Sequence, residues 1–203
     1  MMKMVMMAAL AALILGGQAD ARQAGDWFVG LGLARVEPPA ENGTVIGATL
    51  DIDADTRPFV TIGHALTDRL GAELMLSAPF RHQIELQGRG TIGSFRQSPA
   101  ILSLQYHHPV SDRLTPFAGI GLAHVQFSRA QGTGLLQGAA LDLSDEWGLA
   151  LQAGLDVAVG PRGAIRTEIR WLDLQPDLRL NGAGLGEARI DPVAMGLSYV
   201  LRF

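Results

Sequence analysis

The chain has 203 residues, and its 16 basic side chains against 20 acidic ones leave a formal net charge of -4, which argues against a nucleic-acid partner. It contains no cysteine, which excludes a disulfide framework and thiolate metal sites. The 25 glycines are many for a helical protein and the 48% apolar content is ordinary, so composition leaves a secreted β-domain and a membrane barrel both open.

Residues 1–21 have the pattern of a cleaved export signal. Lys3 precedes an apolar run from Val5 to Leu15, and Ala19 and Ala21 occupy the two positions that a signal peptidase reads. The apolar run is shorter than the roughly 20 residues that a membrane-spanning helix needs. We therefore expect residues 1–21 to be removed on export and residues 22–203 to form one domain.

Eight segments then alternate apolar and polar side chains, with turn residues between them. An even number of amphipathic strands of about ten residues is typical of a closed barrel in the outer membrane. The sequence therefore predicts an all-β fold, an eight-stranded antiparallel transmembrane β-barrel. In chain order the predicted strands lie near 26–36, 59–67, 70–79, 100–108, 116–127, 147–157, 164–174 and 192–203.

The connections between these segments alternate in length. If both termini lie in the periplasm, every short turn is periplasmic and every long loop extracellular, as expected of an outer-membrane barrel surrounded by lipid and lipopolysaccharide. A soluble sandwich has no reason to sort its loops in this way. The short turns are predicted at 67–69, 109–115 and 159–163, and the long loops at 37–58, 80–99, 128–146 and 175–191.

One face of each predicted strand is apolar, and the other carries small or charged residues. In the segment 164–174, Ile165 and Ile169 share one face, and Arg166, Glu168 and Arg170 share the other. Burying that charged row in a dry core would cost several kcal/mol per ion. We therefore expect the apolar faces to meet lipid and the charged faces to line the lumen.

The chain ends on an amphipathic strand whose last residue is aromatic. Tyr199, Leu201 and Phe203 lie on its apolar face, because side chains two apart in a strand point the same way. A terminal strand of this kind is what the barrel assembly machinery of the outer membrane recognises. We expect these three residues to form the assembly signal.

Several blocks of residues follow one another in a fixed order along the mature chain. They include Ala24-Gly25-Asp26-Trp27, Leu102-Ser103-Leu104-Gln105-Tyr106, Asp145-Glu146-Trp147-Gly148, Arg170-Trp171-Leu172-Asp173-Leu174 and Ile190-Asp191-Pro192. In these blocks the chain resembles the OmpW family of small outer-membrane proteins, which includes the AlkL-type hydrocarbon importers. The resemblance implies an eight-stranded barrel with a narrow hydrophobic interior, through which small hydrophobic molecules cross the outer membrane.

Strand direction sorts the inward residues by height. An eight-stranded barrel is only just wide enough for side chains, so opposed charges in its lower half should pair into a plug. Near the extracellular rim we expect an apolar ligand-binding set of Val36, Phe59, Pro79, Ile101, Val125, Phe127 and Leu172. Below it we expect a polar plug of Glu73, Gln105, His107, Gln152, Asp156, Arg166, Glu168, Arg170 and Arg202.

These patterns predict passive uptake of small hydrophobic solutes that bind in the upper lumen and leave sideways into the bilayer. One alternative is a structural barrel or a phage or colicin receptor without transport, and another is a lipid-modifying enzyme. The sequence contains neither a His-x-Ser pair nor a Gly-x-Ser-x-Gly elbow, so no catalytic motif supports the enzyme. Asp51, Asp53 and Asp55 lack the glycine and distal glutamate of a calcium-binding loop, so neither a metal nor another cofactor is expected.

Overall fold

The computed structural model describes residues 23–38, 44–45, 48–187 and 191–203. The predicted export signal at 1–21 therefore lies outside the described residues. Within the described ranges the chain forms β-strands and one short 3-10 helix, η2 (Gly134–Leu136). None of the helices described is long and apolar enough to cross a membrane.

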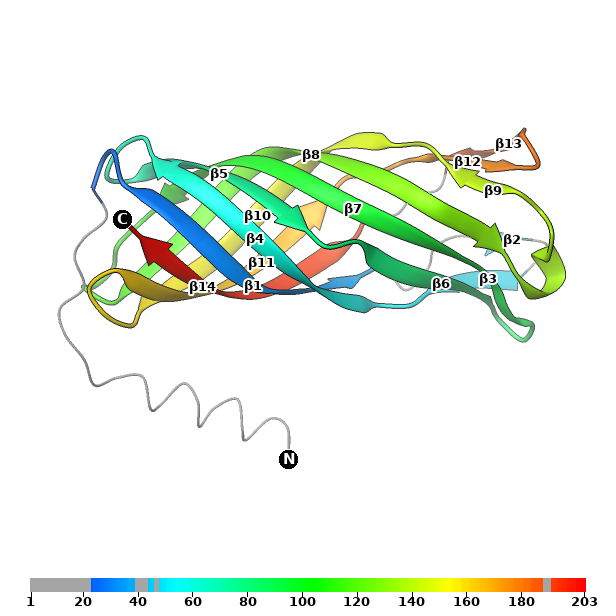
Figure 1. Cartoon of the computed structure of the whole chain (residues 1–203), viewed down its shortest axis with the longest axis horizontal. Coiled ribbons are helices and arrows are strands. Elements are labelled where there is room, and N and C mark those ends of the chain that lie inside the picture. The colour runs from blue at the N-terminus through cyan, green and yellow to red at the C-terminus, as the bar shows by residue number, and fades with distance from the viewer. Residues whose placement is uncertain (1–22, 39–43, 46–47, 188–190) are drawn as a thin grey trace, which may run out of the picture.

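In the described part of the chain, eight long strands close into an antiparallel barrel, which confirms the predicted fold class. Each strand pairs with the next in chain order, and the last pairs with the first. Figure 1 shows this elongated barrel along its length. The eight strands are β1 (Trp27–Glu37), β4 (Asp55–Ala65), β5 (Leu70–Ser77), β7 (Gly90–His107), β8 (Leu114–Gly132), β10 (Glu146–Ala158), β11 (Gly163–Leu172) and β14 (Val193–Arg202).

The two ends of the described chain seal the ring. The backbone N–H of Trp27 donates to the carbonyl of Phe203 at 3.0 Å, and that of Phe203 donates back to Trp27 at 2.9 Å. From there β1 and β14 pair without a register shift up to Glu37 and Val193. Closure matters because an unpaired backbone group facing hydrocarbon costs several kcal/mol.

In the described ranges, the short turns that join one barrel strand to the next lie at the end of the barrel where β1 begins and β14 ends, called the short-turn end below (Figure 1). They comprise residues 66–69, 108–113 and 159–162, close to the predicted positions. In the first of them, the Thr67 hydroxyl accepts a hydrogen bond from the Leu70 N–H at 2.9 Å. The opposite end carries the long connections and is called the long-loop end.

The long connections contain strands that the sequence pattern did not predict. Strands β2 (Thr44–Val45), β3 (Ala48–Ile52) and β6 (Phe80–Leu86) extend the sheet alongside β7, and β9 (Leu141–Leu143), β12 (Asp177–Leu180) and β13 (Ala183–Glu187) form a second sheet. Strand β7 begins at Gly90 instead of near 100, and β8 ends at Gly132 instead of near 127.

The missed strand segments have a physical explanation. In the upper part of β7 the outward residues are polar, including Ser94, Arg96 and Ser98, while Phe95 and Gln97 are buried. An apolar outward stripe is therefore absent there, although the strand continues. The pattern marks the part of each strand that faces lipid, and the strands extend beyond it into water.

Exposed apolar side chains form a band around the barrel, called the apolar belt below. It has members on each of the eight barrel strands, whereas a soluble monomer rarely exposes an apolar patch above a few hundred Å². The structure thus confirms that the apolar faces point outward and the charged faces inward. The belt comprises Leu31, Leu33, Val60, Ile62, Leu76, Leu102, Leu104, Ile120, Leu122, Leu149, Leu151, Ile169, Met195 and Leu197.

Aromatic side chains lie at the edges of the apolar belt. Trp27, Tyr106 and Tyr199 are exposed near the short-turn end, and Trp147 is exposed near the start of β10. Such girdles mark the two interfaces of a membrane barrel. Leu201 and Phe203 are also exposed on the outer face of the last strand. Recognition of this strand by the assembly machinery stays a prediction.

Gly154 on β10 provides a test of packing inside the barrel. A Cβ at this position would lie 2.5 Å from both the Phe117 ring and the Thr167 carbonyl oxygen. We therefore expect Gly154→Ala to destabilise the barrel by about 1–3 kcal/mol through overpacking. The control is Gly184→Ala, because nothing lies within 4 Å of a Cβ there. The measurement is urea unfolding in lipid vesicles, and equal midpoints for the two variants would contradict the expectation.

Candidate functional site

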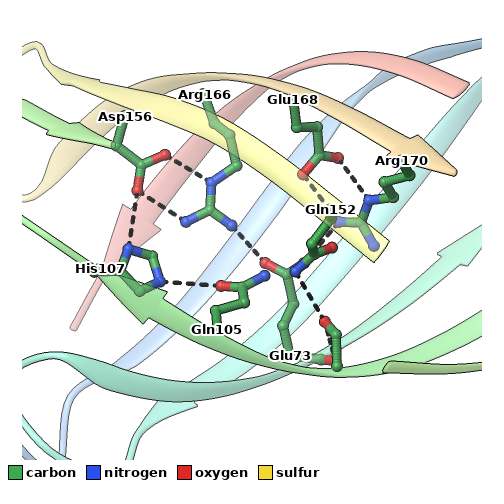
Figure 2. Close-up of polar contacts among 9 residues, drawn as sticks. Glu73, Gln105, His107, Gln152, Asp156, Arg166, Glu168 and Arg170 are labelled. Atoms are coloured by element: carbon green, nitrogen blue, oxygen red, sulfur yellow. Dashed lines mark hydrogen bonds and ion pairs between the residues drawn. The ribbon is translucent and has the colours of Figure 1, made fainter. Parts of the chain in front are cut away.

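Five charged side chains meet in the lower lumen and are called the ion-pair cluster: Glu73, Asp156, Arg166, Glu168 and Arg170 (Figure 2). Arg166 Nη1 donates to Glu73 Oε2 at 2.5 Å, and Arg170 Nη2 donates to Glu73 Oε1 at 2.7 Å. Glu73 lies on β5 and both arginines lie on β11, four strands away around the ring of eight. These two bonds therefore span the full width of the lumen.

The two arginines are also held from their own side of the barrel. Asp156 on β10 accepts two hydrogen bonds from Arg166, from Nε at 2.7 Å and from Nη2 at 2.8 Å. Glu168 accepts from Arg170 Nε at 3.2 Å and from Nη2 at 2.9 Å. Paired forks of this kind give strong and directional contacts. Each guanidinium is thus fixed between two carboxylates.

Burial makes this pairing obligatory. The side chains of Glu73, Arg166 and Arg170 are 0%, 3% and 2% exposed. Breaking a buried ion pair costs about 3–5 kcal/mol, because the remaining charge has no partner. The Arg166 guanidinium carbon also lies 4.5 Å from the centroid of the Phe117 ring, which replaces water on its open face. At this level of the lumen the charges are therefore paired with one another.

Further polar side chains complete this layer. His107 Nε2 lies 3.1 Å from Gln105 Oε1, and His107 Nδ1 lies 3.9 Å from Asp156 Oδ2. Ser103 lies on the same strand, β7, and its Oγ accepts a hydrogen bond from Gln152 Nε2 on β10 at 3.1 Å. The structure thus brings eight of the nine predicted plug residues together, and Ser103 joins them.

Arg202 lies below this layer and lines the same cavity as His107, Asp156 and Arg166, so its role in the plug stays a prediction. It is half-buried at the short-turn end, where it lines an open cavity of about 310 Å³ with Asp68 and Asp112. Among the described residues, no carboxylate forms an ion pair with it. Arg202 is the last residue of β14, and it lies below the level of Arg166 and Asp156.

An apolar cluster fills the lumen above the charges, towards the long-loop end. It contains six of the seven predicted upper residues, namely Val36, Phe59, Ile101, Val125, Phe127 and Leu172. The prediction for Pro79 is wrong, because β5 ends at Ser77 and Pro79 is exposed beyond it. The buried ring of Phe80 occupies the lumen instead.

Sequence reasoning missed other members of the apolar cluster. Met75 lies two residues after Glu73 on the same inward face of β5, so strand alternation could have found it. Phe80 and Phe95 are buried in segments that were predicted to be loops, where no strand pattern was assigned. Leu174 ends the predicted strand 164–174, two residues after the inward Leu172, so alternation could have found it as well. Leu141 and Leu143 come from β9, which is too short to show a period.

The upper lumen is closed in this structure. Directly above the ion-pair cluster, a cavity of about 20 Å³ is bounded by Arg170 below and by apolar side chains including Met75, Phe80 and Ile101. This volume holds roughly one water molecule. Two buried polar atoms near it, Gln97 Oε1 and Arg170 Nη1, have no hydrogen-bond partner among the described residues.

His82 on β6 is buried and contacts Gln97, which lines the cavity. Its Nδ1 lies 2.6 Å from the Asp53 carbonyl oxygen, so this nitrogen donates. Burial lowers the pKa of His82, which keeps the ring neutral and leaves Nε2 to accept from Gln97 Nε2 at 3.0 Å. The Gln97 amide is thereby oriented so that its oxygen has no donor among the residues described. Within the described ranges, no group of three or more histidine, aspartate or glutamate residues could hold a metal ion.

Replacing Glu73 tests the bridging role of the ion-pair cluster. Glu73→Gln removes the charge shared by Arg166 and Arg170, so we expect a loss of about 3–5 kcal/mol in the free energy of unfolding. The matched control is Glu85→Gln on the exposed face of β6, which should change stability by less than about 0.5 kcal/mol. Unfolding by guanidinium chloride in micelles measures the stability of both variants. If Glu73→Gln left the free energy of unfolding unchanged, the pairing would contribute no stability.

Comparison with known proteins agrees with this architecture. The sequence matches the family model of the OmpW family over residues 23–203. Outer membrane protein W of Escherichia coli K12 is 29% identical over 100% of both chains, and outer membrane protein AlkL of Ectopseudomonas oleovorans is 25% identical over 87% of this chain and 82% of that one. The crystal structure of OprG from Pseudomonas aeruginosa superposes with a TM-score of 0.78 at 23% identity, covering 91% of this chain and 99% of OprG.

Proposed function

The chain belongs to the OmpW family of outer-membrane proteins, and on this premise we propose that it admits small hydrophobic molecules through the outer membrane without an energy source. The short-turn end faces the periplasm and the long-loop end faces the exterior. The apolar cluster therefore lies on the side from which a solute arrives. The observation that carries the proposal is the placement of this cluster directly above a sealed layer of ion pairs.

Transfer from water into the upper lumen is favourable for an apolar solute. Each Å² of apolar surface removed from water contributes about 25 cal/mol, in the protein or in the lipid. Movement further down the lumen is unfavourable, because a solute would have to separate Glu73 from Arg166 and Arg170. The solute therefore descends no further than the apolar cluster and leaves through the wall.

A break in the wall beside the cavity supports a sideways exit. Strand β5 pairs with β7 up to Leu76 and Ala100, and β6 resumes the pairing at Phe80 and Gln97. On that side of β7, Ser98 and Pro99 pair with none of the described strand residues, and Pro99 lacks an N–H to donate. Pro99 and Phe80 both line the cavity. The gap thus adjoins the upper lumen at the outer edge of the apolar belt, beside Leu76.

Filling the cavity should stop uptake. Val36 lines the cavity, so we expect Val36→Trp to occupy the solute position and reduce uptake to the level of protein-free vesicles. The control is Gly184→Trp, where a side chain meets open space, and it should transport like the unmodified protein. The assay follows entry of a hydrophobic solute into proteoliposomes with a trapped oxidising enzyme. Equal uptake by both variants would refute a route through the upper lumen.

The sideways and axial routes differ in their response to loss of the lower charges. Replacing Glu73 and Arg166 together by alanine opens the lower lumen to water, so ion conductance across a planar bilayer should rise. Hydrophobic uptake should not rise with it, because the solute leaves above this layer. A parallel increase of uptake and conductance would instead establish an axial path. Absence of uptake by the unmodified protein would favour a barrel without transport.

A further inference from the structure

Three arginines converge on the outer wall near the long-loop end. Arg81 on β6 and Arg96 on β7 are directly paired across the two strands, so their side chains leave the same face. Arg129 follows Ser128, which pairs with Arg96 on its other side. Together the three line a hollow of about 300 Å³. Like charges placed directly opposite each other in a sheet are destabilising, so the arrangement needs an explanation outside folding.

The position of Arg129 depends on a β-bulge. By strand alternation Arg129 would point inward, because the buried Phe127 lies two residues before it. A register shift occurs here between β7 and β8, and Arg129 adopts a positive φ of 52°. This left-handed backbone is costly for a residue other than glycine. The bulge turns the Arg129 side chain outward, where it is exposed beside Arg96.

The charges of Arg81, Arg96 and Arg129 are not paired with carboxylates in the part of the chain that the structure describes. Asp55 is engaged by the Arg57 side chain at 2.7 Å and by the Arg81 backbone N–H at 2.7 Å. Asp53 lines the hollow and accepts from the Gln83 N–H.

The three arginines also repel one another. The pKa of Arg96 is lowered from its ordinary value, first by desolvation and then by the charges of Arg129 and Arg81. The whole chain carries a formal net charge of -4, so a local excess of positive charge runs against its overall balance. An anion in the hollow would relieve the repulsion among all three side chains.

The height of the hollow identifies the anion. On β7 and β8 the apolar belt ends at Leu102 and Leu122, and one pair further out His124 packs against Trp147 at 4.5 Å between ring centroids. Arg96 lies four residues beyond Ala100, the partner of His124. That is ~13 Å along the strand, or roughly 10 Å along the membrane normal for a strand tilted by 35–45°. The arginines therefore stand above the acyl chains at the level of the head groups.

We propose that Arg81, Arg96 and Arg129 bind a phosphate group of lipopolysaccharide in the outer leaflet. The acyl chains of the same molecule would lie on the apolar belt below, against Leu102 and Leu122, so that one lipid contacts both surfaces. Guanidinium groups suit this role because their planar forks bind phosphate oxygens in pairs. The site lies on the outer wall and does not depend on transport through the lumen.

The test compares lipopolysaccharide binding by two triple variants refolded in an uncharged maltoside detergent. R81Q/R96Q/R129Q removes the cluster, and R69Q/R162Q/R179Q removes three exposed arginines elsewhere on the surface. Both lose the same charge. We expect the affinity for phosphorylated lipopolysaccharide to fall at least tenfold in the cluster variant and less than twofold in the control. Equal losses in both variants would overturn the proposal, because they would reflect net charge alone.

Two further arms identify the source of the phosphate. Lipopolysaccharide treated with a phosphatase should bind the unmodified protein as weakly as intact lipopolysaccharide binds the cluster variant. Inorganic phosphate should not displace lipopolysaccharide at equal concentration, because it lacks the contact with the apolar belt. Full displacement by inorganic phosphate, or no effect of the phosphatase, would contradict the assignment.

Stability provides an independent readout. Without lipopolysaccharide, the cluster variant should unfold at an equal or higher denaturant concentration than the unmodified protein, because the repulsion among the arginines is removed. Added lipopolysaccharide should raise the midpoint of the unmodified protein and of the R69Q/R162Q/R179Q control, but not that of the cluster variant. A cluster variant that loses stability in lipid-free micelles would show that the arginines serve the fold and not a ligand.

Discussion

The lower lumen depends on the contact of one carboxylate with two guanidinium groups from the opposite wall. Glu73 reaches across from β5 to Arg166 and Arg170 on β11. The side chains can meet across the lumen because the interior of an eight-stranded barrel is only wide enough for side chains. Four buried charges and the half-buried Asp156 are tolerated in so small a volume because each is paired. This layer divides the interior into an open cavity at the periplasmic end and a closed apolar chamber above.

The polarity of the wall inverts along its length, and strand β7 illustrates the change. In its lower half Leu102, Leu104 and Tyr106 are exposed to the outside, while Ser103, Gln105 and His107 are buried. In its upper half, Phe95 is buried inside and Arg96 lies on the outer face. The solvent explains both halves, because lipid surrounds the lower part and water or head groups surround the upper part. The proposed solute chamber and the proposed phosphate site are the inner and outer faces of that upper part.

Much of this arrangement could be predicted from the sequence, because a period of two is a direct consequence of strand geometry. All eight barrel strands, the short turns and the opposed faces of 164–174 follow from alternation alone. The pairing of Arg166 with Asp156 was also accessible, because the two face each other across β10 and β11. The resemblance of the ordered blocks predicted membership of the OmpW family, which the match over residues 23–203 confirms.

The failures occur where alternation ends or shifts. Pro79 was assigned inward by extending the period past Ser77, where the strand stops. The outward turn of Arg129 depends on a bulge that changes the period by one residue, and bulges leave no clear mark in a single sequence. The strands of the long loops lie in water, so they lack the apolar outer stripe by which the others were found. The proposed phosphate site was invisible for the same two reasons.

The central claim is that acyl chains surround the apolar belt while the ion-pair cluster is enclosed. Solid-state NMR of the protein in lipid bilayers tests it without a substitution, by transfer of magnetisation from acyl-chain protons to assigned side chains. Transfer is expected to Leu104, Ile120 and Leu197, and none to Arg166 or Arg170. Transfer from acyl chains to the two arginines, or only from water to the three belt residues, would contradict the claim.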